Sequence, residues 1–201
     1  MQFNKRFSRG YSYRVSYSRS RAEGNTGGGV SVIIPTQVGD DLRLDANEGP
    51  TNEDRPHILS INGTVEVPRV RGLRVGPTLR YMSGVPFTLT SSSFYLNRNG
   101  RFDDEFLPAG TLSGAGQNPI SVENAGGRNG ARGPDFFEIN LRVTYALSLQ
   151  RAQRIQFFGE IFNLTDRANF VVPNGDQRLS SFLDLRSLRR GNTSRKGQIG
   201  I

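Results

Sequence analysis

The feature that most constrains this chain is an alternation of apolar and polar residues with a period of two. The clearest case is "FFEINLRVTYALSL", where apolar residues from Phe137 to Tyr145 alternate with Glu138, Asn140 and Arg142. A β-strand places alternate side chains on opposite faces, so each such stretch predicts one apolar and one polar face. Helical periodicity is nearly absent. The sequence therefore predicts an all-β fold.

Six stretches carry this signal, and together they predict an antiparallel meander of about six strands. Their approximate ranges are 3–19, 56–68, 72–90, 134–148, 154–164 and 195–201. The first is expected as one strand with an aromatic face that holds Phe3, Phe7, Tyr11, Tyr13, Val15 and Tyr17. The fifth is apolar on both parities and predicts its faces less clearly.

The connections between these stretches alternate in length. Long ones are expected at about 20–55, 91–133 and 165–195, and short ones at about 69–71 and near Gln150. Loops this long are unusual in a compact soluble domain. They are typical of a membrane β-barrel, which has short periplasmic turns, long outer loops and strands of about 9–11 residues. Six crossings would leave both ends of the chain on the periplasmic side. A soluble β-sandwich also has alternating strands, but it does not explain the alternating connections.

Composition narrows the function classes. The absence of cysteine excludes disulfides, thiolate metal sites and cysteine nucleophiles. No apolar run reaches the length of a transmembrane helix, and Met1–Arg6 does not resemble a signal peptide. We therefore expect a cytosolic protein or a fragment of a larger one. The net charge of +8 could indicate nucleic-acid binding, but the arginines are spread over strands and loops, so we do not expect it.

No catalytic constellation is visible, and we predict that the chain is not an enzyme. The only histidine, His57, has no nucleophile and acid beside it in sequence. The adjacent carboxylates Asp103 and Asp104 would point apart on a strand. The glycine-rich stretch "ENAGGRNGARGPD" lacks the lysine and helix that a phosphate-binding loop requires.

The stretch "NRNGRFDDEF" is similar to the centre of a calcium-binding loop. Placing Gly100 at the sixth position of such a loop makes the following residues candidate ligands: Asn97, Asn99, Asp103 and Glu105. Tyr95 then occupies the first position, where a carboxylate belongs, so only a weak calcium site is expected. The other interpretation is an exposed polar turn built on Asn99-Gly100, which needs no ligand. No other cofactor is predicted.

Several strings resemble one known family. "GEIFNLTDRANF" (159–170) resembles a strand and turn near the C-terminus of TonB-dependent outer-membrane receptors. "NEGPTNEDRPHILSINGTVEVP" (47–68) resembles a segment of their Oar-like subgroup. "YMSGVPFT" and "SRKGQIGI" resemble a strand end and the start of the last strand. The resemblance covers most of the chain, from about residue 3 to residue 201, in order.

This resemblance implies a segment, 1–201, of a larger receptor barrel in the cell outer membrane, without the plug domain or TonB box of the family. The implied function is solute uptake, which this segment would not perform alone. The implied partners are outer-membrane lipid, the remaining barrel strands and plug, a solute of unspecified class and, in full-length receptors, the TonB complex. The alternative is a soluble or surface-exposed β-rich binding module stabilised by calcium.

Overall fold

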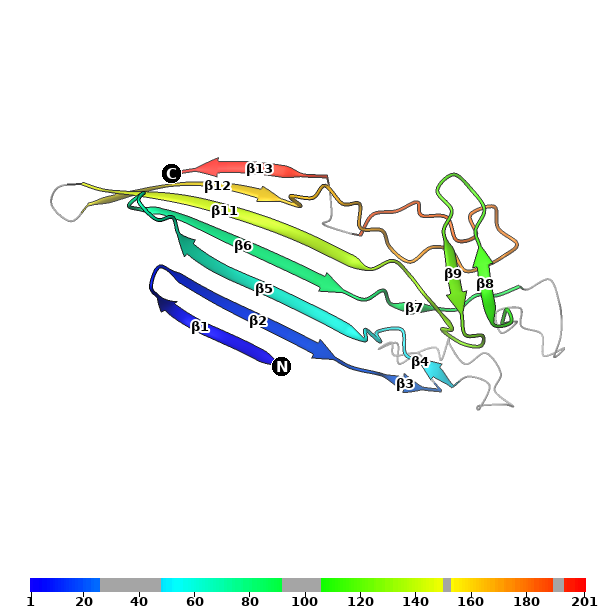
Figure 1. Cartoon of the computed structure of the whole chain (residues 1–201). Coiled ribbons are helices and arrows are strands. Elements are labelled where there is room, and N and C mark those ends of the chain that lie inside the picture. The colour runs from blue at the N-terminus through cyan, green and yellow to red at the C-terminus, as the bar shows by residue number, and fades with distance from the viewer. Residues whose placement is uncertain (26–47, 92–105, 150–152, 190–193) are drawn as a thin grey trace, which may run out of the picture.

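The computed structural model describes residues 1–25, 48–91, 106–149, 153–189 and 194–201. The fold is all-β, as predicted, and its main element is an antiparallel meander of seven strands in the order β1-β2-β5-β6-β11-β12-β13 (Figure 1). Their bounds are β1 Gln2–Ser8, β2 Tyr11–Arg19, β5 His57–Glu66, β6 Leu73–Met82, β11 Phe136–Ser148, β12 Arg154–Phe162 and β13 Lys196–Gly200. We call these seven strands the long sheet.

The first predicted strand is in fact a hairpin, so the expectation of one strand over 3–19 was wrong. β1 and β2 are joined by Arg9 and Gly10, which have φ values of 53° and 83°. Two consecutive residues with positive φ are the requirement of a type I′ turn, whose twist matches that of the flanking strands. Arginine rarely adopts this conformation, so the Arg-Gly pair carried little turn signal. The long sheet consequently has seven strands instead of six.

This hairpin also changes where the chain begins. Met1 exchanges backbone hydrogen bonds with Tyr17, toward the end of β2 that leads into a long connection. The expectation that both ends lie on the side of the short turns was therefore wrong for residue 1. We call the side with the β1–β2, β5–β6 and β11–β12 turns the short-turn end, and the opposite side the cap end.

A bulge in β1 reverses the faces that were predicted for it. Lys5 pairs with Tyr13 and Ser8 pairs with Tyr11, so three steps along β1 match two along β2. An extra residue of this kind shifts the following side chain to the other face. Phe7 accordingly lies against Arg74, with the guanidinium 5.3 Å from the ring centroid. The prediction that Phe7 shares a face with Phe3 was wrong.

The short β5–β6 turn requires glycine at one position. Gly72 has a φ of 84°, and a Cβ added there would lie 2.2 Å from the backbone oxygen of Ala146. The Gly72 carbonyl also accepts a hydrogen bond of 2.9 Å from the Ala146 amide. This close approach holds the turn against the end of β11.

The described parts of the three long connections form a second body, which we call the cap. It contains a four-stranded sheet in the order β7-β10-β9-β8 and a two-stranded ribbon of β3 and β4. The bounds are β3 Glu23–Gly24, β4 Gly49–Pro50, β7 Pro86–Phe87, β8 Gly110–Ser113, β9 Ser121–Asn124 and β10 Ala131–Arg132. Residues 182–185 of the β12–β13 connection form backbone hydrogen bonds with the loop between β8 and β9 (Figure 1). The predicted strand over 72–90 was therefore too long, because β6 ends at Met82 and β7 belongs to the cap.

The hydrophobic core of the molecule lies in the cap. It consists of the buried residues Phe87, Leu89, Leu107, Val122, Ala131, Phe182 and Leu183. In contrast, Phe136 is the only buried residue of the long sheet, all of whose residues the structure describes. The long sheet is therefore held by backbone pairing between strands, and the cap by the burial of apolar side chains.

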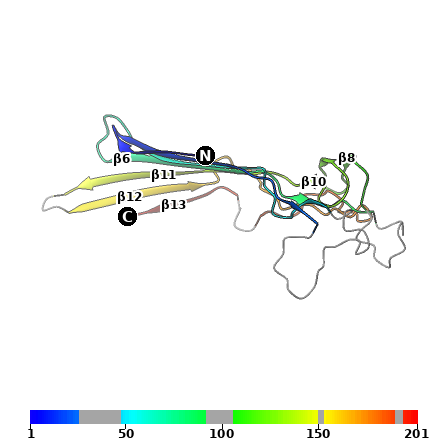
Figure 2. The same ribbon diagram turned by 90° about the horizontal axis from the view of Figure 1, so that it is seen from below.

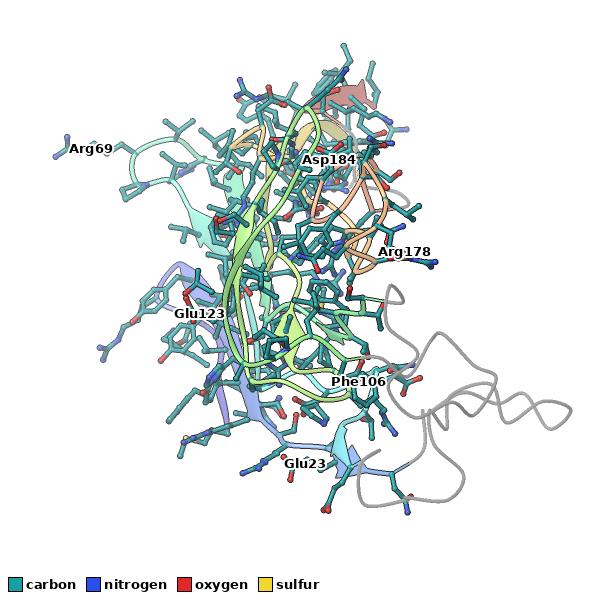
Figure 3. All side chains as sticks on the ribbon, turned by 90° about the vertical axis from the view of Figure 1, so that its right-hand side faces the viewer. Glu23, Arg69, Phe106, Glu123, Arg178 and Asp184 are labelled. Carbon is teal, nitrogen blue, oxygen red and sulfur yellow. The ribbon has the colours of Figure 1, made fainter. Side chains whose placement is uncertain are left out.

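Polar side chains fasten the three connections to one another. Asp54 is buried, accepts a 2.7 Å hydrogen bond from the Ala22 amide and pairs with Arg132 of β10. Asp184 lies beside the tip of the β8–β9 hairpin (Figure 3) and accepts a 2.7 Å hydrogen bond from the Asn118 amide. Hydrogen bonds and an ion pair thus join the three connections into one unit, the cap, at one end of the long sheet.

The long sheet is curved and open. Seen from below, β11, β12 and β13 turn away from the plane of the first four strands (Figure 2). Among the described residues, β1 pairs only with β2 and β13 only with β12. Both edges therefore present unpaired backbone groups.

Candidate functional site: the two faces of the long sheet

One face of the long sheet is apolar and exposed, and we call it the apolar face. Strand pairing aligns its side chains in rows across the sheet, for example Val15, Ile61, Leu79 and Ile139. Ten of its side chains have exposed fractions between 37% and 63%: Phe3, Tyr11, Tyr13, Val65, Val143, Tyr145, Leu147, Ile155, Phe157 and Ile161. Soluble monomers rarely expose a continuous apolar surface of this extent. The apolar face must therefore contact something other than water.

Aromatic side chains border the apolar face at two levels. Tyr17, Tyr81 and Phe137 lie near the cap end, and Tyr11, Tyr13, Tyr145 and Phe157 lie near the short-turn end. On β11 the two levels are eight residues apart, from Phe137 to Tyr145. At about 3.4 Å per residue and a strand tilt of about 40° from the barrel axis, these eight residues span about 20 Å along that axis. Lipid-facing bands of membrane barrels are about 25 Å tall between aromatic girdles.

The opposite face, which we call the polar face, carries ion pairs that cross between strands. Arg74 of β6 donates to Glu66 of β5 at 2.6 Å, and Arg142 of β11 donates to Glu160 of β12 at 2.6 Å. The Gln198 side chain of β13 also donates to Glu160. These contacts join side chains of five neighbouring strands in two groups at similar depth.

Aromatic rings also occur on the polar face, in the stretch whose faces the alternation did not distinguish. Phe158 of β12 lies under Arg142, with 4.4 Å between the guanidinium carbon and the ring centroid. This placement explains why β12 is apolar on both parities. A ring beneath a guanidinium is a favourable cation–π arrangement, and it holds Arg142 against the sheet.

A hollow of about 240 Å³ lies on the polar face near the short-turn end. We call it the basin; it is lined by Thr64, Gly72, Arg74, Gly76, Arg142, Thr144, Arg154 and Gln156. Its lining contains three arginines and no acidic residue. The side chain of Arg154 makes no ion pair with any acidic residue in the described part of the chain.

A second group of arginines lies where the polar face meets the cap. The guanidinium groups of Arg80 and Arg189 lie 6.0 Å and 5.7 Å from the centroid of Phe136. Arg55 donates a 2.7 Å hydrogen bond to the Ser83 carbonyl. Burial lowers the pKa of Arg189, and the nearby charge of Arg55 lowers it further. Both remain cationic at neutral pH, because guanidinium groups do not lose their proton in proteins.

The motif "GEIFNLTDRANF" ends β12 and fastens the chain to β11. Asn169 is fully buried; its side chain accepts a 2.9 Å hydrogen bond from the Phe137 amide and donates one of 2.9 Å to the Phe137 carbonyl. Asn163, with a φ of 49°, ends the strand, and its amide donates to Asn140 at 2.8 Å. The two asparagines thus continue the pairing of β11 past the end of β12, so we assign them a structural role.

The candidate calcium ligands Asn97, Asn99, Asp103 and Glu105 lie outside the described residues. Within the described part of the chain, no group of three or more histidine, cysteine or acidic residues is placed to hold a metal. His57 contacts Tyr17 on the apolar face, with 2.8 Å between its Nδ1 and the tyrosine hydroxyl. No helix in the described residues could cross a membrane.

Comparison with known proteins gives one match. A family model described as "Outer membrane beta barrel domain" matches residues 1–199. No curated protein matches the chain, and no solved structure matches it.

Proposed function

Because the chain belongs to the family of outer membrane beta barrel domains, we propose that it is a wall segment of a TonB-dependent receptor of the Oar-like subgroup, which takes up a solute across the outer membrane. The motifs "GEIFNLTDRANF" and "NEGPTNEDRPHILSINGTVEVP" support the receptor class by their resemblance to it. The single observation that carries membrane insertion is the apolar face, bordered by aromatic residues at two levels. The family match and this face favour a membrane barrel over a soluble binding module.

In this proposal the apolar face contacts lipid and the polar face lines the lumen. Lipid offers no partner to a backbone amide or carbonyl, so a sheet in a membrane must close on itself. The edges β1 and β13 therefore pair with further strands of the complete receptor. A plug fills the cylinder that they enclose until it is moved, and the solute then passes along the polar face. The cap lies outside the cell, because the long connections of outer-membrane barrels are extracellular. There it is the first part of the wall that a solute meets.

The orientation can be tested by labelling whole cells. An epitope inserted in the tip of the β8–β9 hairpin is expected to be labelled on intact cells. An epitope in the β5–β6 turn, at Arg69, is expected to be labelled only after the outer membrane is opened. Labelling of the Arg69 epitope alone on intact cells would overturn the orientation, and recovery of the chain outside the outer-membrane fraction would overturn the insertion.

Energy coupling needs a separate test in cells that carry the full-length receptor. Uptake of its solute is expected to stop when the TonB protein is removed, and to return when TonB is restored. Uptake that continues at the same rate without TonB would exclude the receptor class while leaving the barrel fold untouched.

A further inference from the structure

We propose that the polar face binds small anionic solutes that carry phosphate or carboxylate groups, and that the basin is the binding site nearest the short-turn end. This inference rests on the proposed function, because it names the chemical class of solute that the lumen favours. It is carried by the charge, the shape and the alignment of the polar face.

Charge is the first observation. The polar face of the long sheet holds six basic residues against three acidic ones, an excess of three positive charges. The basic residues are Arg14, Arg74, Arg80, Arg142, Arg154 and Lys196, and the acidic ones are Glu66, Glu138 and Glu160. Channel walls lined by arginine and lysine favour anions. The excess of positive charge also raises the local concentration of anions near this face.

The basin gives this charge a place to act. Gly72 and Gly76 form part of its lining, and their missing side chains leave room for a solute between Arg74, Arg142 and Arg154. Hydroxyl and amide groups of Thr64, Thr144 and Gln156 add hydrogen-bond donors to the same lining. Guanidinium groups suit phosphate and carboxylate because their fork of N–H donors can bind two oxygens at once.

The arginines at the cap end extend the same path. Arg80 and Arg189 flank Phe136 at the junction with the cap, and Arg55 lies close enough to repel Arg189. Three cations are thus gathered at the entrance to the polar face, where Arg55 and Arg189 repel each other and Asp135 offsets part of that repulsion at Arg189. An anion passing between them would relieve that repulsion. Basic side chains therefore mark both ends of the wall, from the cap to the basin.

The test is calorimetric titration of inorganic pyrophosphate into the purified full chain, held in an uncharged detergent at low ionic strength. We expect saturable binding of pyrophosphate and none of the cation spermidine. Arg154→Gln should weaken pyrophosphate binding by roughly three- to tenfold, the loss of about one charge-assisted hydrogen bond at an exposed site. The matched control is Arg69→Gln, which removes the same charge from an exposed turn and should leave affinity unchanged.

A second variant tests the basin without changing charge. A Cβ added at Gly76 would meet only ordinary contacts of 3.4 Å or more, so Gly76→Val should fold, fill the basin and weaken binding. Equal losses in Arg154→Gln and Arg69→Gln, or unchanged affinity in Gly76→Val, would overturn the site. If pyrophosphate binds in this way but uptake does not require TonB, the receptor class fails and the anion site stands. If uptake requires TonB and no variant changes anion binding, only this inference fails.

Discussion

An arginine in the middle of the apolar face provides the sharpest test of membrane insertion. Leu141 of β11 pairs with Pro77 and Ile161 on the apolar face and lies four residues from each aromatic level, at Phe137 and Tyr145. It is therefore close to the midplane of the proposed lipid-facing band. Leu141→Arg would place a guanidinium at this depth, with no water to solvate it.

The expected cost follows from that depth. Arginine at the midplane of a membrane barrel costs about 2–4 kcal/mol, and the cost falls to about 0–1 kcal/mol near the interfaces. Leu147→Arg, beyond the Tyr145 level, should therefore cost about 0–1 kcal/mol. Thr78 lies on the polar face one residue from Pro77, at nearly the depth of Leu141. Thr78→Arg should cost little, because that face already carries Arg74 and Arg80.

The assay is the free energy of unfolding of the three variants and the original chain, measured by denaturant titration in lipid vesicles. The physical reasoning requires the largest loss for Leu141→Arg and smaller losses for both Leu147→Arg and Thr78→Arg. Equal losses for Leu141→Arg and Thr78→Arg would refute the assignment of the two faces. A Leu141→Arg chain that folds in water without detergent would refute membrane insertion.

Three further predictions concern the cap and its attachment. Leu89→Ala removes a fully buried side chain and should destabilise the cap by about 2–5 kcal/mol. Hydrogen-exchange protection should fall in the cap and not in the long sheet. An equal loss of protection in both would contradict the separate stabilisation of the cap and the long sheet. Asn169→Ala removes two hydrogen bonds to the β11 backbone and should lower the free energy of unfolding by about 1–3 kcal/mol in denaturant titration. An unchanged value would exclude the structural role assigned to Asn169. The hydrogen bond from Arg186, and then that from the Asn118 amide, lower the pKa of Asp184 below its ordinary 3.8. The ionised Asp184 therefore stabilises the fold above pH 3.8, and this stabilisation is lost as pH falls through the lower pKa of the folded state. In the original chain, hydrogen-exchange protection of the Asn118 amide should fall over that pH range. Asp184→Asn should abolish this pH dependence.

The sequence predicts the strands of the long sheet well where both faces are uniform. β5, β6 and β11 alternate over most of their length, and there their apolar and polar faces are those that the pattern indicates; Ile58 and Phe136, at the cap end, are apolar residues on the polar face. The prediction fails where backbone geometry intervenes. Arg9 adopts a positive φ, which is uncommon for a residue other than glycine. The bulge in β1 then places Phe7 on the polar face. Phe158 is an apolar residue on the polar face for a different reason. Its ring packs against Arg142 of the neighbouring strand β11, and a contact between strands cannot be read from the alternation within β12.

The candidate site was predictable only in part. The polar alternation on β6 and β11 predicts a polar wall, because Arg74, Arg80 and Arg142 share one parity with hydrophilic neighbours. The basin was not predictable, because it depends on which residues of four strands lie side by side. Register sets these neighbours, and the alternation of residues within each strand does not specify it. The glycines that line the basin, Gly72 and Gly76, are visible in the sequence, but only the register places them beside Arg154.

The position of the hydrophobic core follows from the same physics as the two faces. A sheet with lipid on one side and a lumen on the other has no face that is buried in a protein core. Its side chains therefore remain exposed within the protein, and its strands depend on backbone pairing. The cap is in water, where the burial of apolar side chains does stabilise a fold. Its strands of two to four residues are too short to show a period, which is why the alternation did not reveal them. The two bodies should therefore respond to different perturbations. A change in bilayer thickness should act on the long sheet, and a cavity in the core should act on the cap.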